Sequence, residues 1–484
     1  MNWLQHILYH VSAQPGRPAI VLEDRVVTYE MLGQGITRCA NRLAAAELGD
    51  RGMAAVLIAN PTRHLIVCLA LTRLGIAALS LEHGQLGIQE QKVAAVLGDA
   101  MARPLLAASQ RYIEVDDDWF AIDLPAPPEP AAGFADGTAI CHASLTAGTT
   151  GHPKPVPISV DVLGEFVLEN VLHSIDLSRH TVLCLPGLGS GYGYNFSVAA
   201  MAMGRTLCIA PNSEAALRMI ELYAVDFVLT STEQLLALTK LARLTGARLD
   251  SLRCVRTGGS LITRTLLEAA TTYVCRDILC DYGASEAGLI ARATVADALA
   301  SPGLAGRVFP WIEVAILDAN GDRCPSGRPG LVNVRRIGHA LPTNASRSRH
   351  DAIPWIELGD MGWMDADSQL HVVGRTTDTS APRRHVSPAA EVEHAAWLEF
   401  TVADVAAIEL ESDADPSEPQ IWLAVVGRHG GTTTDFQAVL KARGLPGAIR
   451  FFDVTAIPRG NNGKVRRGEL KAMLLAASVG MGRS

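Results

Sequence analysis

The chain lacks the features that would mark it as secreted, membrane-spanning or stabilised by disulfides. Its 484 residues contain nine cysteines but no Cys-x-x-Cys pair, and several cysteines sit inside apolar runs. We therefore expect buried free thiols, as in cytosolic proteins, and neither a metal site nor a disulfide framework. Residues 1–6 have neither the basic start nor the apolar core of a signal peptide. No run of about 18 apolar residues is present, so no membrane span is expected.

Charge of either sign is limited as well. Charged residues make up 19% of the chain, and the formal net charge is −8 at pH 7. This mildly acidic balance gives no reason to expect nucleic acid or an anionic membrane surface as a partner. What the chain does have is length and apolar content, with 48% hydrophobic residues. Both suffice for two or more domains with sizeable cores, and we expect a cytoplasmic location.

Short apolar segments alternate with helical patterns through the first 300 residues. Such an alternation indicates parallel βαβ units and hence an α/β fold. The expected strands are residues 54–59, 77–81, 182–185, 206–210, 227–230 and 278–282, and the expected helices include 64–74, 215–223 and 261–274.

The pattern changes after about residue 300. Two short strands, 313–317 and 330–335, flank a turn at 318–322. The end of the chain is predicted to form a separate small α+β unit. Its expected elements are strands at 405–410, 421–426 and 450–454 and helices at 391–398 and 466–476. Composition places the boundary of this unit only loosely, in the polar stretch 376–384.

The stretch that organises the chain is residues 144–154, Ser-Leu-Thr-Ala-Gly-Thr-Thr-Gly-His-Pro-Lys. Gly148 and Gly151 let the backbone turn tightly and bring its N–H groups close to an anion. The side-chain donors are the hydroxyls of Thr146, Thr149 and Thr150 and the ammonium of Lys154. This is the chemistry of a polyphosphate cradle, although the order of a Walker loop is absent. The alternative is an ordinary Ser/Thr/Gly loop.

Three further motifs follow in order. They are Tyr282-Gly283-Ala284-Ser285-Glu286, then Gly359-Asp360 with Gly374-Arg375, and last Asn462-Gly463-Lys464-Val465-Arg466-Arg467. Together with residues 144–154 they resemble the motifs of adenylate-forming enzymes, which include acyl-CoA synthetases, peptide-synthetase adenylation domains and luciferases. The chain is most like an acyl-CoA synthetase. The resemblance implies a large N-terminal domain, residues 1–374, of parallel α/β sheets with a small β-rich part, and a small mobile α+β domain, residues 375–484.

The resemblance also implies catalytic roles. Thr146 to Lys154 would hold the β- and γ-phosphates of ATP. Glu286 would bind Mg²⁺, which suits a hard oxygen ligand, with Thr149 as a further ligand. Lys464 would swing in from the small domain to contact the reacting carboxylate and the α-phosphate, where charge develops. Thr146, Glu286 and Lys464 are therefore the candidate catalytic residues.

Nucleoside recognition follows from the same resemblance. Asp360 resembles the carboxylate that accepts hydrogen bonds from the ribose hydroxyls, and Arg375 resembles its partner. Tyr282 offers a ring for adenine stacking, and the carboxylate of Asp281 could accept a hydrogen bond from the adenine amine. The remaining candidates in this set are Thr149, Thr150, Gly151, Lys154, Gly258, Gly259, Ser260, Gly283 and Ser285. Ser285 stands where the family usually has threonine, and both residues carry a hydroxyl.

The acid-binding segment, residues 186–196, departs from the family pattern. Gly189 aligns with a position that is usually histidine or aromatic in acyl-CoA synthetases. The segment has no acidic side chain to hold an α-amino group, so an amino-acid substrate is disfavoured. Its glycines indicate either a flexible gate or space for a larger acyl group. Tyr192 and Tyr194 are candidates for the pocket lining.

The hinge segment departs as well, because Thr377 stands where the family usually has Asp or Lys, and a polar run with Pro382 follows. Adenylation does not need these residues, but thioester formation does. We therefore expect ATP- and Mg²⁺-dependent activation of a small carboxylic acid, followed by transfer to CoA. Transfer to an acyl carrier protein or to an amine remains open, as does a non-catalytic nucleotide-binding protein. The presence of Glu286 and Lys464 argues against the last.

Overall fold

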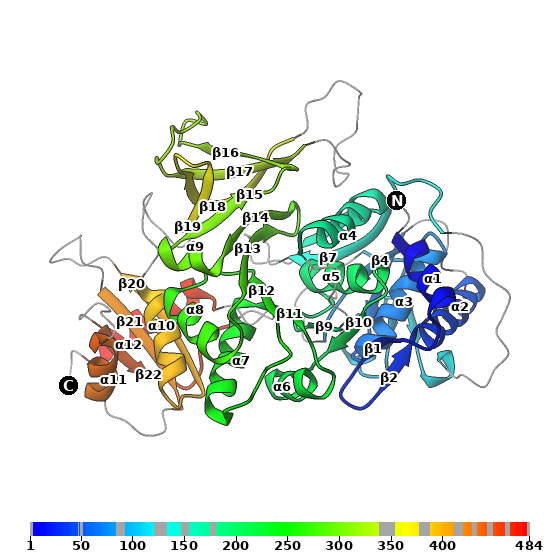
Figure 1. The fold of residues 1–484 in the computed structure, drawn as a ribbon, viewed down its shortest axis with the longest axis horizontal. Helices are drawn as coiled ribbons and strands as arrows, with labels where there is room; N and C mark the ends of the chain where they lie inside the picture. Colours follow the sequence, from blue (N-terminus) through cyan, green and yellow to red (C-terminus); the bar gives the residue numbers. More distant parts are fainter. Residues whose placement is uncertain are drawn as a thin grey trace.

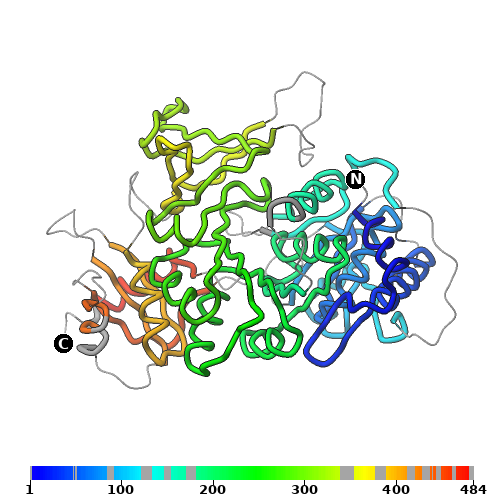
Figure 2. The backbone as a smooth tube through the Cα atoms, in the orientation of Figure 1, coloured from blue at the N-terminus to red at the C-terminus, as the bar shows by residue number. Residues whose placement is uncertain are grey.

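The computed structural model describes residues 3–46, 48, 52–83, 92–120, 133–146, 154–174, 181–337, 354–376, 388–410, 420–427, 433–442, 449–459 and 465–481. Within these residues the strands form three sheets. The first 120 residues lie at one end of the molecule and the C-terminal unit lies at the other, with the parallel part of the largest sheet between them (Figures 1 and 2).

The first sheet has the order β6-β5-β3-β4-β7-β8. Its strands are β3 (Met53–Leu57), β4 (Ala77–Ser80), β5 (Ala95–Gly98), β6 (Tyr112–Glu114), β7 (Ile140–Thr146) and β8 (Lys154–Ser159). The pairs are parallel except that β8 runs antiparallel to β7, with Thr146 opposite Lys154. The predicted phosphate loop therefore connects β7 to β8, directly after a parallel strand.

The second sheet has the order β16-β17-β18-β19-β15-β14-β13-β12-β11-β9-β10-β1-β2. Its parallel part runs from β1 to β13 and comprises β1 (Pro18–Val21), β9 (Thr181–Cys184), β10 (Thr206–Ile209), β11 (Phe227–Ser231), β12 (Cys254–Gly258) and β13 (Ile278–Ala284), with β2 (Val26–Thr28) antiparallel at the edge. Each parallel strand matches a predicted apolar segment within a few residues where one was predicted, because a buried strand needs an uninterrupted apolar run.

The β-rich part that was expected after residue 300 is continuous with this second sheet. Antiparallel pairing carries the sheet on from β13 through β14 (Gly288–Thr294), β15 (Leu304–Val308), β19 (Gln369–Arg375), β18 (Ile356–Met364), β17 (Gly330–Arg336) and β16 (Ile312–Leu317). Figure 1 shows these strands projecting above the parallel part. The sheet thus joins the predicted nucleotide residues of β13 to those of β18 and β19.

Helices cover both faces of the parallel strands. One buried apolar cluster joins Val56 of the first sheet and Phe227 of the second to helices on the inner face, and a second cluster covers the opposite face. The inner helices are α1 (Trp3–Ala13), α2 (Tyr29–Ala45), α3 (Pro61–Arg73), α4 (Val160–Ser174) and α5 (Gly191–Ala202), and the outer ones are α6 (Ser213–Leu222), α7 (Thr232–Thr245) and α8 (Arg264–Tyr273). Short segments η2 (Arg103–Leu105), η3 (Asp117–Trp119) and α9 (Val295–Ala300) complete this part.

Side-chain caps fix where several of these helices begin. Thr28 accepts a hydrogen bond from the backbone of Met31 at the start of α2, as its position in the sequence indicates. Ser190 does the same for Gly193 at the start of α5. The predicted gate at residues 186–196 therefore becomes the first turn of a helix from Gly191 onward. A Cβ on Gly193 would lie 2.4 Å from the carbonyl oxygen of Gly187, so this turn packs closely on the preceding loop.

The C-terminal unit is a small sheet with the order β20-β21-β22. It comprises α10 (Pro388–Glu399), β20 (Asp404–Leu410), β21 (Gln420–Val426), α11 (Thr433–Ala442), β22 (Ile449–Asp453) and α12 (Arg467–Met481). α10 packs against this sheet and also against α7 and α8 of the large part (Figure 1).

Two further observations concern the thiols and the length of the helices. The nine cysteines are free, and all but Cys324 are buried. In the described part of the chain, no helix is long and apolar enough to cross a membrane.

Candidate active site

The carboxyl ends of β12 and β13 form the centre of the candidate site. Ligands of α/β sheets bind at this end of parallel strands. The Tyr282 hydroxyl, from β13, donates a 2.7 Å hydrogen bond to Asp360 Oδ2 on β18. Arg375 Nε, on β19, lies 3.2 Å from Asp360 Oδ1. The structure thus brings together three predicted nucleotide residues from three strands.

The electrostatics of this triad favour a preformed acceptor. Burial, and then the charge of Asp360, raise the pKa of Tyr282 well above its ordinary value, so the hydroxyl stays protonated and donates. The Arg375 side chain is half-exposed while that of Asp360 is largely buried. Asp360 is therefore held as an oriented carboxylate, as binding to vicinal hydroxyls would require.

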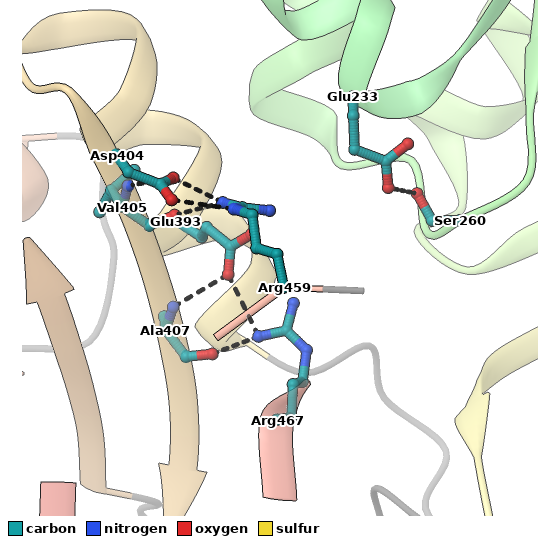
Figure 3. A network of polar contacts seen from close by, with 8 residues as sticks. All are labelled: Glu233, Ser260, Glu393, Asp404, Val405, Ala407, Arg459 and Arg467. Atoms are coloured by element: carbon teal, nitrogen blue, oxygen red, sulfur yellow. Dashed lines mark hydrogen bonds and ion pairs between the residues drawn. The ribbon is translucent and has the colours of Figure 1, made fainter. Parts of the chain in front are cut away.

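The Gly258–Ser260 turn lies beside Tyr282. A Cβ on Gly258 would lie 2.5 Å from the carbonyl oxygen of Asp281 on the neighbouring strand. Gly259 has a φ of +94° and open space on its Cβ side, a conformation that favours glycine. Ser260 Oγ donates to Glu233 Oε1 at 2.7 Å, which fixes the end of the turn (Figure 3). The turn therefore leaves Gly259 open on its Cβ side, and the close approach of a base to it remains a prediction.

The contacts of Asp281 do not favour its predicted hydrogen bond to the adenine amine. Its side chain is 2% exposed, and its Oδ2 accepts from Arg256 Nε, also a 2%-exposed side chain. Arg292 Nε donates to its Oδ1 at 2.6 Å. Burial alone would raise the pKa of Asp281, but the two guanidiniums outweigh burial and hold the pKa below its ordinary value. These contacts favour a structural ion pair over the proposed hydrogen bond to the adenine amine.

The motif residues after Tyr282 form the turn from β13 to β14. Ser285 and Glu286 are half-buried there. A Cβ on Gly283 would lie 2.5 Å from the carbonyl oxygen of Gly288, so the pairing of the two strands requires glycine at this position. Among the described residues, no group of three or more His, Cys, Asp or Glu is arranged to hold a metal ion. Glu286, at the same strand end as Tyr282, is the described residue whose oxygens suit the predicted Mg²⁺.

Two predicted elements lie at the edge of the described residues or beyond it. Thr146 and the exposed Lys154 bracket the phosphate loop as the facing ends of β7 and β8. Thr149, Thr150 and Gly151 lie outside the described residues, as does Lys464.

The structure describes the residues on both sides of the Lys464 segment. An isolated bridge pairs Arg459 with Val465. Arg459 Nη2 bonds Asp404 Oδ1 at 2.6 Å, and Arg467 Nη1 bonds Glu393 Oε2 at 3.1 Å and the carbonyl oxygen of Ala407 (Figure 3). Both flanks of the segment are thus anchored to the small domain.

The predicted pocket residues divide into two groups. The backbone N–H of Gly189 donates to Glu82 Oε1 at 2.9 Å, and a Cβ on Gly189 would lie 2.8 Å from Glu82 Cγ. The ring of Tyr192 lies under the Arg256 guanidinium, 5.5 Å from its Cζ. Tyr194 is fully buried and stacks on His142 at 3.6 Å between ring centroids. Tyr194 therefore packs in the core, whereas Gly189 and Tyr192 face polar groups.

The sequence interpretation did not single out Glu82, Asn170, Arg256 or Arg292. Glu82 follows β4 and brings a carboxylate to the segment 186–196, which itself has none. A usable signal exists for the two arginines, because each interrupts an apolar strand: Cys254-Val255-Arg256 in β12 and Ala291-Arg292-Ala293 in β14. A charged residue inside a buried strand needs a buried partner, and its presence marks a polar site or a structural ion pair.

These features describe an α/β protein whose predicted nucleotide residues meet at the carboxyl ends of its parallel strands. The chain belongs to the AMP-binding enzyme family, whose profile matches residues 8–341. It is 26% identical to the indoleacetate–CoA ligase of Aromatoleum aromaticum, with 96% of each chain covered. It is 24% identical to the 2-succinylbenzoate–CoA ligase of Listeria monocytogenes, covering 97% of this chain and 98% of that one.

Solved structures share the whole fold. The o-succinylbenzoate CoA synthetase of Bacillus subtilis in complex with its acyl-adenylate has a TM-score of 0.76 at 21% identity, covering 97% of this chain and 98% of that one. An anthranilate CoA ligase in complex with anthranoyl-AMP has a TM-score of 0.80 at 18% identity, covering 99% and 98%. An amide bond synthetase of Marinactinospora thermotolerans has a TM-score of 0.75 at 21% identity, covering 98% and 99%. The predicted family and fold class are confirmed, while the boundary at residue 374 remains a prediction.

Proposed function

We propose that this protein uses ATP to convert a carboxylic acid to its acyl-adenylate and then transfers the acyl group to the thiol of CoA. In the first step the carboxylate oxygen attacks the α-phosphorus and pyrophosphate leaves. In the second step the thiol sulfur attacks the acyl carbon and AMP leaves. The full-length relatives are named as CoA ligases, which confirms the predicted class of AMP-forming acid–thiol ligase. The observation that carries the proposal is the Tyr282–Asp360–Arg375 triad at the strand ends.

The first step brings two anions together, so the site must offset negative charge and align the reactants. Asp360 would hold the ribose hydroxyls, and Gly259 would let the base approach the backbone. Thr146 and Lys154, at the two ends of the phosphate loop, would direct its donors at the β- and γ-phosphates. Lys464 would contact the α-phosphate oxygens as their charge increases.

Magnesium is part of the proposal. Glu286 offers a half-buried carboxylate beside the triad, and Thr149 would add a hydroxyl from the phosphate loop. These are hard oxygen ligands of the kind that Mg²⁺ takes together with phosphate oxygens. When bound, the ion would offset part of the phosphate charge.

For the acid we propose a small aromatic carboxylate. Indoleacetate, succinylbenzoate and anthranoyl groups appear in the names of the relatives and neighbours. The side chain of Glu82 fills the space beside Gly187 and Gly189, so the proposal of an aromatic acid rests on these names.

The acceptor has a second candidate class. One relative is a fatty acid–[acyl-carrier-protein] ligase of Streptomyces coeruleorubidus, at 23% identity over 97% of this chain, and the amide bond synthetase shares the fold. Thr377 and Pro382 stand in the hinge segment and motivate this alternative, since a Pro there fixes one φ angle and removes a backbone donor.

The test has two stages. Pyrophosphate exchange into ATP, screened over a panel of aromatic acids, should identify acids that are activated, and no exchange with any acid would refute the proposal. A single-turnover experiment should then follow the preformed acyl-adenylate after CoA is added. Formation of a thioester supports CoA as the acceptor. Persistence of the adenylate with CoA, and its loss on adding a carrier protein or an amine, would replace CoA by that acceptor.

A further inference from the structure

A buried arginine of β17 joins helix α4 to the turn that carries Glu286. Arg336 is 2% exposed, and its Nη1 donates a 2.7 Å hydrogen bond to the carbonyl oxygen of Ala287, the residue after Glu286. Its Nη2 donates to Glu169 Oε1 and lies 3.5 Å from Glu165 Oε2, and both of these residues belong to α4. One guanidinium therefore holds two carboxylates of a helix and one backbone group of the motif turn.

An aromatic ring of α4 packs against the same part of the turn. The buried ring of Phe166 has its centroid 5.1 Å from Arg336 Cζ. Gly288 has a φ of +74°, and a Cβ there would lie 2.5 Å from Phe166 Cε1. The peptide unit between Ala287 and Gly288 is thus held by a hydrogen bond at its carbonyl and covered by a ring at its glycine. We call Arg336 and its three partners on α4, Glu165, Phe166 and Glu169, the α4 clamp.

Charge balance alone does not account for the clamp. Glu165 and Glu169 already offset the charge of Arg336, as a buried ion pair requires. The hydrogen bond to Ala287 is additional to these pairs. It uses the planar fork of the guanidinium, which directs separate donors at a carboxylate and at a carbonyl. Arg336 therefore connects the helix to the motif turn as well as closing an ion pair.

The clamp also links the two sides of the predicted metal site. Helix α4 begins at Val160, directly after β8, and β8 begins with Lys154 at the end of the phosphate loop. Glu286 stands in the turn between β13 and β14. An ion that binds both phosphate oxygens and Glu286 needs these two sides held in a fixed relation, because metal affinity depends on the orientation of the ligands.

We propose, on the basis of the function proposed above, that Arg336 is a positioning residue, which fixes the turn through Ala287 and so orients the Glu286 carboxylate for the Mg²⁺ that accompanies ATP. In this role Arg336 acts through the backbone and contacts neither the ion nor the nucleotide. Groups that orient a metal ligand typically contribute about 10–100-fold to metal affinity or activity. Loss of the clamp should therefore raise the Mg²⁺ requirement and leave the rate at saturating Mg²⁺ largely intact.

Three variants test the clamp. Arg336→Lys keeps a positive charge beside the two carboxylates but replaces the fork by a single ammonium. Arg335→Lys is the matched control, because this neighbouring residue of β17 is 32% exposed and pairs with Glu313. Phe166→Leu removes the ring beside Gly288 and keeps the ion pairs. It should shift both measurements below in the same direction as Arg336→Lys, and it carries the test should that variant fail to fold.

The first measurement is hydrogen–deuterium exchange in the full-length protein without nucleotide or Mg²⁺. The backbone amides of residues 285–289 should exchange about ten-fold faster in Arg336→Lys, because the turn loses a hydrogen bond. The second measurement is a Mg²⁺ titration of pyrophosphate exchange with an accepted acid. The Mg²⁺ concentration for half-maximal exchange should rise at least about ten-fold in Arg336→Lys, with the rate at saturating Mg²⁺ within about three-fold of the unmodified protein. Arg335→Lys should change neither measurement.

The outcomes separate the two proposals. Pyrophosphate exchange with no acid at all in the unmodified protein would refute the proposed function and this inference with it. Exchange in that protein, together with an unchanged half-maximal Mg²⁺ concentration in Arg336→Lys and Phe166→Leu, would refute the inference and leave the proposed function intact. A loss of rate that saturating Mg²⁺ does not restore would indicate a merely structural role for Arg336 and would also overturn the inference.

Discussion

The ion pairs of Arg256 and Arg292 with Asp281, which we call the arginine cluster, and the polar contacts of α10 with α7 and α8 are built in opposite ways. In the cluster, the side chains of Arg256 and Asp281 are each 2% exposed and their charges meet directly. At the α10 surface, the Arg243–Glu399 pair is 3.3 Å apart and each side chain is about a quarter exposed, at 25% and 23%. Most of the other contacts there join a side chain to a backbone group, such as Lys240 Nζ to the carbonyl oxygen of Phe400 at 3.0 Å.

This difference separates a fixed site from a contact that can be released. Opening the cluster would expose an unpaired buried charge, which costs several kcal/mol. The partly exposed ion pair of α10 costs less to break, because such pairs contribute about 0–1 kcal/mol each. α10 also buries Leu398 against the apolar cluster of the large part. We predict that the small domain rotates between the two proposed steps. In that rotation the cluster would stay intact while α10 separates from α7 and α8.

The largest effect should come from breaking the cluster. Asp281→Asn keeps the shape but removes the negative charge between Arg256 and Arg292. We expect a loss of about 3–5 kcal/mol in the free energy of unfolding, as for other buried pairs that lose one partner. Urea unfolding followed by tryptophan fluorescence measures it. Asp277→Asn, at an exposed position before β13, is the control and should change stability little. Equal stability of the two variants would show that the cluster is not a fixed element.

The next effect concerns Lys464, which we propose enters the site from the small domain. Lys464→Ala should lower pyrophosphate exchange on the order of 10²–10³-fold, because it removes one contact to charge that develops in the transition state. ATP binding, measured by calorimetry, should persist, since all the other predicted nucleotide residues except Arg375 lie in the large domain. Lys471→Ala, on the exposed side of α12, controls for loss of a positive charge and should exchange normally. Near-normal exchange in Lys464→Ala would contradict the assignment.

The sequence predicted the parallel strands well because each buried strand is an apolar run, as in 206–210 for β10 (Thr206–Ile209). It predicted the triad because local motifs carry those residues. It did not predict the role of Asp281, whose partners lie 25 and 11 residues away. It also could not rank Tyr192 and Tyr194. Neighbours on nearly every side bury α5, so no apolar periodicity marks its open face.

The third prediction concerns the pH dependence of stability that two buried histidines of the first sheet should cause. His64 Nε2 and His142 Nε2 lie 3.0 and 2.9 Å from Ser80 Oγ, fully enclosed. Burial lowers the pKa of His64 to about 4 and, together with the charge of His64, lowers the pKa of His142 to about 3. Both rings are thus neutral in the folded state, while the unfolded chain takes up protons below pH 6.5. Stability present above pH 6.5 is therefore lost as the pH falls toward 4.

The corresponding measurement is urea unfolding at pH 7, 6 and 5. Each histidine should cost about 2 kcal/mol between pH 6.5 and 5. His142→Gln should remove its share of this pH dependence whatever its effect on stability at pH 7. His6→Gln, at an exposed position on α1, should retain all of it. An unchanged pH dependence in His142→Gln would mean that this ring is protonated in the folded protein.

The smallest expected effect comes from weakening the contact between Glu391 of α10 and the start of α8. The carboxylate of Glu391 accepts from the backbone N–H of Arg264 at 2.8 Å and of Thr265 at 3.1 Å, the first two residues of α8. It thereby caps a helix of the large domain from the small one and meets the positive end of the helix dipole. Beside it, His394 Nδ1 is 2.8 Å from the Thr263 hydroxyl. These contacts hold the small domain in the arrangement seen in Figure 1.

Glu391→Gln removes the charge but keeps one acceptor oxygen, so we expect the α10 contact to weaken by about 1 kcal/mol. Rotation of the small domain should then become easier, and limited proteolysis in the predicted linker between Arg375 and His385 should be about five-fold faster. Glu469→Gln is the control, because Glu469 is exposed on α12 and its partner among the described residues is the neighbouring Arg466. If Glu391→Gln and Glu469→Gln are cleaved at the same rate, the cap does not restrain the small domain. Faster cleavage accompanied by faster acyl transfer from the preformed adenylate would show that release of α10 limits the second step.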